Sequence, residues 1–561
     1  QVFVNASNGD IVTTINNLHG DQEYTSAVSE SGDIRGFSVD HSGNYYYMQD
    51  LANYNLKILN SNSSIISSTK LDGTWDSQAV ELYTNTMKVI DWYREQFGRD
   101  YIARNNNGRT VQIVTHAPGY PDNAAWKVGE NKMYFGNRSY SIYRTSMAAD
   151  IGIVVHEVNH GVLEDNIGVN FPWSGVTASI NQGYADLFGC LYEEQWLHGK
   201  NYLKPGGYYN CVRDIANPTS SKAENRVSSG AITINNPYVH AYVQIEGVLV
   251  SHAAYLMQQK GMSWDDLRKL WYKSMSMGYN ASSNFYTVRQ CVMKAGRKLG
   301  FSEDKLQMIR DAFDEEHIYD SQAALFGKVT DYTGGTPING AAVKAVRGTK
   351  SYTASTGTDG YYDKALDLAT YDVTVSAPGY VDFTAKKRLS EESKDVRLDA
   401  ALVKTGTGTI SGYIINAENN DPISGVTLKV ISGWDNEDGT VLQTVTTDAD
   451  GHYTLTINSG YYTIVKEKAG YLTSSFNATV APENNRQQNS YMTATDIFVN
   501  DGKRIVLSWG EKPEDLDAHL VGKLSDGSNF HVFYAERNGK NAAGSTVANL
   551  DVDNKEGNGH E

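Results

Sequence analysis

The spacing of hydrophobic positions changes twice along the chain, and each spacing predicts a different kind of structure. From Tyr24 to about Lys70 polar residues alternate with aromatic ones, which is the period of an antiparallel sheet. Apolar residues recur at helical spacing from Ser77 to Phe97, and an apolar run without proline from Asp150 to Leu163 predicts a mostly buried helix. Helical patterns, one of them from about Ser179 to His198, continue to about Glu316. Shorter strands or hairpins are predicted at 1–19, 110–115 and 132–136.

This order of elements predicts two lobes, the first rich in strands and the second rich in helices. The helix at 150–163 joins them. Because ligand sites usually lie in the clefts between such lobes, we expect a site beside that helix.

After about residue 320 the pattern returns to short strands with frequent turns, which indicates all-β domains. An internal repeat is visible there. The stretch that begins at Gly327 returns 85 residues later at Gly412, and the stretch that ends at Tyr380 returns 91 residues later at Tyr471. The second copy therefore carries an insertion of six residues, which we place at Trp434–Gly439.

Neither copy contains a cluster of side chains suited to catalysis. We interpret both as spacers or attachment modules, and contact with carbohydrate or with a cell surface stays open. A third β-unit is expected from about Asp496, where paired aspartates suit either Ca²⁺ or ordinary charged turns.

The length, composition and net charge of the chain narrow the class of protein. A chain of 561 residues is too long for one hydrophobic core, and 40% hydrophobic with 11% aromatic residues is typical of folded domains. A net charge of −16 argues against nucleic acid and against an anionic membrane surface as partners. No apolar run approaches the ~20 residues that a membrane span needs. Three widely spaced cysteines do not indicate a disulfide framework, and the absence of an initial Met suggests a fragment of a longer protein.

The strongest chemical signal is His156-Glu157-Val158-Asn159-His160 in the predicted buried helix. Two histidines four residues apart lie on one helix face and can reach the same Zn²⁺, and Glu157 can then take a proton from metal-bound water. The pattern also recurs by chance, with His160 as an ordinary core histidine. Burying His, Glu and His together is costly unless something pairs them, which favours the metal.

Motifs spread over the first half resemble the thermolysin-like zinc metallopeptidases. The resemblance runs from about Tyr24 to His317, and the repeats resemble carboxypeptidase regulatory-like domains, a transthyretin-like sandwich. It rests on these segments: Tyr45–Asp50, Asn123–Trp126, Met133–Gly136, His156–His160, Ser179–Gly189, Cys211–Pro218 and Ser251–Leu256.

The resemblance implies a multidomain fold. An α+β peptidase, with a β-rich N-terminal lobe and an α-helical C-terminal lobe, is followed by all-β sandwich domains. The implied boundaries are 1–20 for a propeptide remnant, 21–165 and 166–320 for the two lobes, 324–403 and 408–495 for the sandwiches, and 496–561 for a truncated surface β-domain.

The resemblance also assigns roles to single residues. His156 and His160 match the two histidine ligands of zinc, and Glu157 matches the general base. Asn123 and Ala124 are implied to pair with the substrate backbone in the manner of an added strand.

Three further residues match supporting positions. Asn181 and Asp186 match groups that orient the two histidines. Arg213 matches an arginine that grips a substrate carbonyl.

Several positions depart from the family pattern. The third zinc ligand is a glutamate in the family, and its place is taken by Gln182, whose amide can coordinate but lacks the charge. A tyrosine that donates to the oxyanion is replaced by Phe171, and such a donor typically contributes ~10²-fold in rate. The remaining oxyanion donor falls on either His240 or Gln244, and we favour His240, although a histidine bonded within a loop is about as plausible.

The resemblance therefore implies a zinc site, but the calcium site of the family is expected to be lost. Zn²⁺ is the implied cofactor. Glu193 matches a calcium carboxylate, but its partner position is Gly152, so the double-calcium site is expected to be lost and Glu193 to be solvated or salt-bridged.

Two functions follow from these residues. The first is a secreted zinc metalloendopeptidase, extracellular or on the cell surface, that acts on peptide or protein substrates through Glu157-activated water. The second is a weakened or inactive relative kept as a surface binding or structural module. The complete His156, Glu157 and His160 set favours the first, and Gln182 with Phe171 favours the second.

Overall fold

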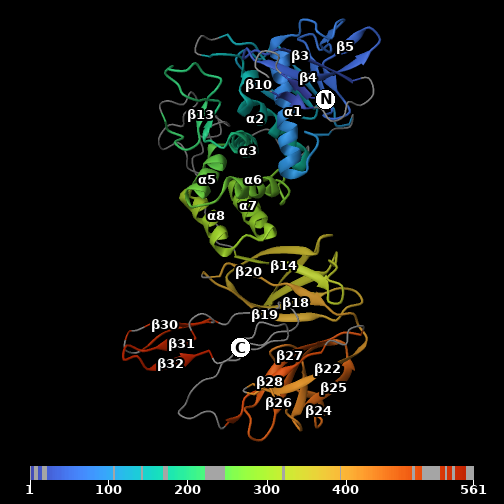
Figure 1. The fold of residues 1–561 in the computed structure, drawn as a ribbon, viewed down its shortest axis with the longest axis vertical. Coiled ribbons are helices and arrows are strands. Elements are labelled where there is room, and N and C mark those ends of the chain that lie inside the picture. Colours follow the sequence, from blue (N-terminus) through green and yellow to red (C-terminus); the bar gives the residue numbers. More distant parts are fainter. Residues whose placement is uncertain are drawn as a thin grey trace. The chain divides into compact units, whose positions relative to one another are not determined.

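The alternating segment that begins near Gln22 forms a four-stranded antiparallel sheet, as its period predicts. Its order is β3-β4-β5-β8 (Figure 1). The bounds are β3 Gln22–Val28, β4 Ile34–Ser42, β5 Tyr45–Tyr47 and β8 Ser67–Ser68. At the start of the chain β1 (Val2–Val4) and β2 (Ile11–Thr14) form the predicted antiparallel hairpin.

The computed structural model divides into two units, residues 1–321 and 322–561. The residues it describes are 2–4, 11–14, 22–104, 108–139, 143–168, 175–220, 247–318, 323–391, 393–417, 419–482, 487–495, 519–524, 527, 529–533 and 537–550.

A second sheet of the first unit has the order β10-β11-β9-β7-β6. Strand β9 runs parallel to β7 and β11, whereas β10 pairs antiparallel with β11 at the edge. The bounds are β6 Gln49–Asp50, β7 Leu56–Leu59, β9 Val111–Val114, β10 Ala124–Lys127 and β11 Lys132–Phe135. The edge position of β10 matters for function because one side of its backbone has no partner strand among the described residues.

Helices make up the rest of the first unit. Helix α1 (Ser77–Phe97) has the predicted bounds, since the Asp76 side chain accepts a hydrogen bond from the Ala79 backbone N–H and Gly98 ends it in the left-handed conformation. The others are η1 Met147–Ala149, α2 Ile151–Ile167, α3 Gly175–Glu193, α5 Val248–Gln259, α6 Trp264–Ser274, α7 Phe285–Leu299 and α8 Glu303–Glu315.

The prediction of a helix reaching His198 is wrong at its C-terminal end. Helix α3 stops at Glu193, and the next residue, Glu194, has a positive φ of 51° that a continuing helix does not allow. The chain then forms β12 (Leu197–His198), which pairs antiparallel with β13 (Arg213–Asp214). His198 therefore lies in a two-stranded ribbon, whereas the sequence predicted it on a helix.

The second unit contains the two predicted sandwiches. In the first, β17-β14-β20, with β21 also paired to β14, faces β16-β15-β18-β19; in the second, β25-β22-β28 accompanies β24-β23-β26-β27. The first has β14 Ala323–Asp331, β15 Ala342–Arg347, β16 Lys350–Ser355, β17 Tyr361–Leu366, β18 Ala369–Ser376, β19 Phe383–Leu389, β20 Asp395–Arg397 and β21 Ala400–Leu402. The second has β22 Thr407–Asn416, β23 Thr427–Ser432, β24 Val441–Thr446, β25 His452–Asn458, β26 Gly460–Glu467, β27 Ser474–Val480 and β28 Ser490–Met492. Two hairpins follow, β29 Leu520–Lys523 with β30 Asn529–Val532 and β31 Asn538–Lys540 with β32 Thr546–Asn549.

The six-residue insertion lies where the repeat comparison predicts it. Residues 348–349 connect β15 to β16, whereas residues 433–440 connect the corresponding β23 to β24. The longer loop carries Trp434, whose ring packs at 5.3 Å from Phe383 of the first sandwich and 5.6 Å from Tyr461 of the second. The Tyr461 hydroxyl donates to the Ala401 carbonyl oxygen. The insertion therefore takes part in the contact between the two sandwiches.

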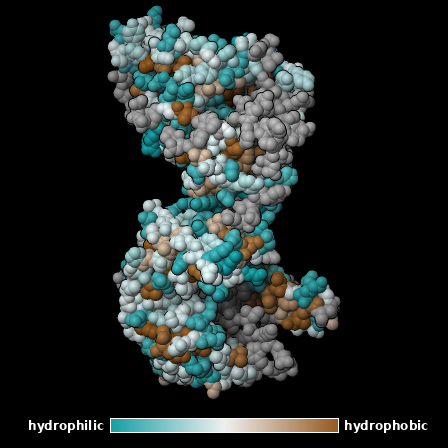
Figure 2. Space-filling model, turned by 180° about the vertical axis from the view of Figure 1, so that it is seen from behind, coloured by the Kyte–Doolittle hydropathy of each residue, from teal (hydrophilic) through white to brown (hydrophobic). Residues whose placement is uncertain are grey.

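The surface, the hydropathy of the helices and the state of the cysteines can be compared with the composition of the chain. Hydrophobic residues on the face drawn in Figure 2 occur in several separated areas with hydrophilic residues between them. Among the described residues no helix is long and apolar enough to cross a membrane. Cys190, Cys211 and Cys291 are buried and unbridged, as their spacing predicts.

Candidate active site

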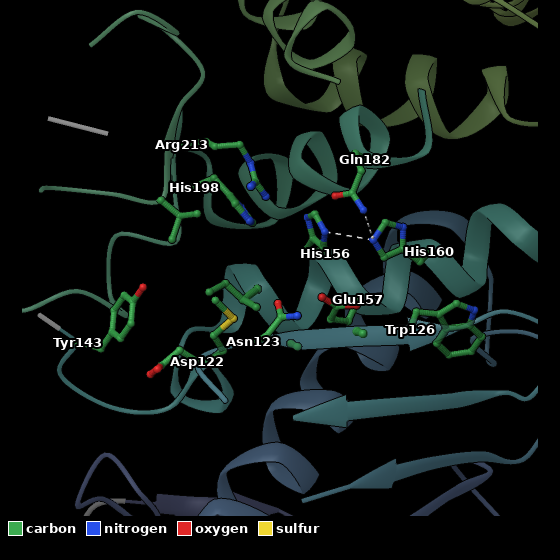
Figure 3. A pocket seen from close by; sticks show the side chains of 15 residues that line it. Asp122, Asn123, Trp126, Tyr143, His156, Glu157, His160, Gln182, His198 and Arg213 are labelled. Atoms are coloured by element: carbon green, nitrogen blue, oxygen red, sulfur yellow. Dashed lines mark hydrogen bonds between the residues drawn. The ribbon is translucent and has the colours of Figure 1, made fainter. Parts of the chain in front are cut away.

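Helix α2 carries His156, Glu157 and His160 into a cleft of the first unit (Figure 3). Their exposed fractions are 6%, 5% and 3%. The two imidazole Nε2 atoms face each other at 3.1 Å. Four-residue spacing on a helix thus places both ring nitrogens at one point in the cleft.

Each imidazole is held from behind by helix α3. The Nδ1 of His160 lies 2.5 Å from the Asn181 side-chain oxygen, and the Nδ1 of His156 lies 2.8 Å from Asp186 Oδ1. The Asn181 oxygen accepts from His160 Nδ1, which leaves the lone pair of that ring on Nε2. His156 Nδ1 is close to Asp186, but the two groups are not aligned as a hydrogen bond. Asn181 and Asp186 therefore lie next to the ring nitrogens that face away from the cleft.

The side chains fit a tetrahedral divalent metal. With Zn–N distances of ~2.0–2.1 Å, two histidine nitrogens on one zinc ion are about 3.3 Å apart, close to the separation found here. Burial, followed by the neighbouring His156, lowers the pKa of His160 well below its ordinary value. The ring is therefore uncharged, and its Nε2 lone pair can bind a metal ion. The side-chain nitrogen of Gln182, Nε2, lies 3.4 Å from His160 Nε2, so this α3 residue is next to the same point, and a rotation of its amide would turn the oxygen toward it.

Glu157 is the buried carboxyl of this cleft. Burial raises its pKa, while the nearby imidazole of His156 and a hydrogen bond from the Trp126 backbone N–H oppose that shift. A carboxyl whose pKa moves toward neutrality can both accept and return a proton. His156, Glu157 and His160 also form the first of two clusters among the described residues with the spacing of a metal site.

The edge strand β10 borders the same cleft. Trp126 Nε1 donates to Glu164 of α2 at 2.8 Å, and the Gly129 N–H donates to the other oxygen of Glu164 at 2.8 Å. Gly161 allows this approach, because a Cβ there would meet the Trp126 ring. Asn123 and Ala124 consequently line a cavity of about 340 Å³ together with the residues of α2.

Arg213 lines the cleft and pairs with Asp186, which is fully buried behind it. Arg213 Nη2 donates to Asp186 Oδ1 at 2.5 Å. Although burial alone would raise it, Arg213 and the imidazoles of His198 and His156 hold the pKa of Asp186 well below its usual range. Arg213 therefore contacts the group next to His156 as well as lining the cavity.

His198 was missed by the sequence analysis. It lines the cavity, with its Nε2 3.5 Å from Asp186 Oδ1 and its ring 5.3 Å from that of His156. Burial lowers its pKa to about 3, although Asp186 opposes this. His156, Asp186 and His198 form the second metal-like cluster, but Arg213 already occupies Asp186 Oδ1.

Three residues named from the sequence lie outside the described residues: Phe171, His240 and Gln244. Glu193 is described and is neither fully solvated nor in a salt bridge that the structure records. Its two carboxylate oxygens accept hydrogen bonds from the side-chain amides of Gln195, at 3.0 Å, and Asn201, at 3.1 Å. The expectation of a plain solvated or salt-bridged residue is therefore met only in part, because the carboxyl is half-buried and two side-chain amides donate to it.

Comparisons with known proteins agree with this geometry. Residues 24–164 match the thermolysin metallopeptidase catalytic domain, and residues 170–318 match the thermolysin metallopeptidase alpha-helical domain. The chain belongs to the thermolysin metallopeptidase family. Residues 324–403 and 409–493 each match the carboxypeptidase regulatory-like domain.

Curated relatives are similar at low identity. Neutral protease B of Bacillus subtilis (strain 168) is 23% identical over 328 residues, which cover 53% of this chain and 58% of the relative. The thermostable neutral protease NprT of Geobacillus stearothermophilus is 22% identical over 316 residues, covering 51% and 56%. The chain thus spans little more than half the length of these relatives. Among solved structures, the precursor of protealysin, a metalloproteinase from Serratia proteamaculans, is 19% identical, covering 47% of this chain and 87% of its own, with a TM-score of 0.40.

Proposed function

We propose that this chain is a zinc-dependent metalloendopeptidase that hydrolyses peptide bonds in the cleft of its first unit. One observation carries the proposal. His156 and His160 converge at one point beside the buried Glu157, with Asn181 hydrogen-bonded to His160 and Asp186 next to His156. A set of buried polar groups held this way has no packing advantage, since similarly shaped apolar residues would cost less to bury.

His156, His160 and Gln182 would hold the metal. Zinc, when bound at such a site, polarises a carbonyl group and makes water a stronger nucleophile at neutral pH. Gln182 offers a neutral oxygen, so the chain holds zinc less tightly than it would with a glutamate there.

The protein's own groups divide the remaining work. Glu157 takes the proton of the attacking water and passes it to the departing amine, which its raised pKa favours. The unpaired side of β10, with Asn123 and Ala124, aligns an extended peptide by backbone hydrogen bonds. Arg213 keeps His156 oriented through Asp186 and offers its guanidinium to a substrate carbonyl.

The test is hydrolysis of a quenched fluorescent peptide library at saturating Zn²⁺. The wild type is compared with Glu157→Gln and with Glu95→Gln, an exposed glutamate on α1 that serves as the matched charge control. Cleavage by the wild type and the control, loss of it in Glu157→Gln, and inhibition by a chelator are expected. Equal hydrolysis by all three proteins would refute the role of Glu157.

A second function is favoured by Gln182, because a lost ligand charge is what a decayed site would show. In that case the first unit is a non-catalytic binding or structural module. Absence of cleavage in the wild type, together with its appearance in a Gln182→Glu, Phe171→Tyr double variant, would favour this alternative. Zinc content alone does not separate the two functions.

The sandwiches are proposed as attachment modules of an extracellular or cell-surface protein. This rests on their tandem arrangement and on the absence of a catalytic cluster among their described residues. A peptide or protein substrate is the partner expected for the first unit, and contact with carbohydrate or a cell surface is a further proposal for the second.

A further inference from the structure

The first hairpin after the sandwiches, β29 with β30, carries two exposed histidines (Figure 1). The two strands pair antiparallel, with Val521 opposite His531. His519 is two positions before Val521, and Phe533 is two positions after His531. Side chains two positions apart in a strand point the same way, as do residues opposite each other in a pair. Both histidines and the Phe533 ring therefore share one face of the hairpin.

The two imidazoles approach each other through ring nitrogens. His519 Nδ1 lies 2.8 Å from His531 Nε2. The ring of Phe533 stacks on both imidazoles, with centroid distances of 5.3 Å to His519 and 4.6 Å to His531 and interplanar angles of 11° and 22°. This stacking orients the rings, while their exposure leaves the nitrogens accessible to an ion from solution.

The pair has the geometry of two ligands on one metal ion. Two histidine nitrogens on a tetrahedral zinc ion are about 3.3 Å apart, and a small rotation of either exposed ring reaches that separation from 2.8 Å. The imidazoles of His156 and His160 in the cleft are similarly spaced, at 3.1 Å. A direct hydrogen bond between two exposed rings contributes little, because water competes for both partners. A shared metal ion would hold the two rings together more strongly.

The described part of this β-unit buries little apolar surface. Among the residues of 519–550 whose side chains the structure describes, only Val532 is buried. Leu520, Val521 and Val547 are 41%, 67% and 43% exposed. An isolated hairpin is marginally stable at best, and small folded units with little core are commonly stabilised by disulfides or a metal ion. The three cysteines of the chain all belong to the first unit, so a disulfide is excluded here.

The ligand type narrows the choice of ion. Imidazole nitrogen suits Zn²⁺, Cu²⁺ and Ni²⁺, whereas Ca²⁺ and Mg²⁺ prefer oxygen ligands. The histidine pair therefore indicates a transition metal, in contrast to the Ca²⁺ considered for the aspartates of this unit. The net charge of −16 also favours the approach of a cation over that of an anion.

We propose that His519 and His531 bind a divalent transition metal ion, for which Zn²⁺ is the probe, and that this ion cross-links β29 and β30. The site belongs to the second unit and is independent of the peptidase function proposed for the first. Because only two side chains hold the ion and both are exposed, it binds Zn²⁺ more weakly than the buried site and fills after it.

The experiment removes the cleft site so that the second one can be measured. In the full chain, the double variant His156→Ala, His160→Ala is titrated with Zn²⁺ in competition with a chromogenic chelator. A further His519→Gln or His531→Gln change is expected to weaken the remaining zinc binding at least about tenfold. His452→Gln, an equivalent change in the second sandwich, is expected to leave it unaltered.

Hydrogen exchange of the wild type gives a second readout that does not depend on the folding of a variant. Saturating Zn²⁺ is expected to slow exchange of the backbone amides of β29 and β30, because the ion joins both strands. Saturating Ca²⁺ is expected to have no such effect. Hairpin exchange that Zn²⁺ leaves unaltered, equal slowing by Ca²⁺, or equal zinc binding by the His531→Gln and His452→Gln chains overturns the proposal.

Discussion

Replacing Glu193 by glutamine is expected to stabilise the first unit at pH 8 and to have a smaller effect at pH 5. The Glu193 carboxyl and the Asp150 carboxyl both lie around Gly152, where the absence of a Cβ leaves them room. Asp150 is buried and accepts hydrogen bonds from the backbone N–H groups of Ile153, Asn201 and Tyr202, so it cannot move away. Burial, with repulsion from Asp150, raises the pKa of Glu193 to about 7.

The sign of the effect follows from the raised pKa. The unfolded carboxyl titrates near its model value of 4.5, whereas the folded one titrates near 7. The protonated form is therefore favoured by folding, and stability is lost as the pH rises from the first value through the second. Because Glu193 is partly exposed, we reduce the full linkage value to about 1–2 kcal/mol at pH 8, with about a quarter of it present at pH 5.

Thermal unfolding at the two pH values provides the assay. Glu193→Gln is expected to raise the Tm of the first unit by about 2–5 °C at pH 8 and by about 1 °C at pH 5. Glu95→Gln is the control and is expected to change neither. A lower Tm for Glu193→Gln at pH 8, or an equal change at both pH values, would refute the reasoning. Since backbone N–H groups donate to the Asp150 oxygens and side-chain amides to those of Glu193, millimolar Ca²⁺ is also expected to leave the wild-type Tm unchanged.

Three further changes have distinct expected results. Asn181→Ala removes the acceptor of His160 Nδ1 and is expected to weaken zinc binding about 10–100-fold, measured by competition with a chromogenic chelator. Gln182→Glu is expected to tighten zinc binding in the same assay, and an unchanged affinity would show that this side chain is not a ligand. Trp434→Ala, which removes a side chain that is 40% exposed but packs on Phe383, is expected to lower the stability of the second unit by about 1–2 kcal/mol, measured by denaturant unfolding.

Elements with strong local signals were predictable from the sequence. The helix from Ser77 to Phe97 has its apolar spacing bounded by a capping aspartate and a left-handed glycine. The insertion at Trp434–Gly439 followed from two offsets between the repeats, because equal strands keep equal spacing.

The candidate site was predictable where its residues share one helix. His156, Glu157 and His160 lie on α2 four residues or fewer apart, whereas Asn181 and Asp186 lie on α3 and were named only by the resemblance. His198 could not be found in this way, because its place depends on pairing with Arg213 in a later strand. No proline or glycine marks the end of α3, so the change from helix to strand left no local signal.

The surroundings of Glu193 illustrate the same limit. Its sequence neighbours predict an ordinary surface carboxylate, whereas its pKa is set by Asp150, which precedes another helix, and by the missing side chain at Gly152. Burial and repulsion arise only after the two helices have packed.

Cleavage of a quenched fluorescent peptide by metal-free chain, titrated with Zn²⁺, tests the central claim most directly. The account predicts no cleavage after treatment with a chelator, a rise that levels off at one zinc per chain, and no rise in His156→Ala. Cleavage that persists without metal, or that stays absent from the wild type at saturating Zn²⁺, would contradict it.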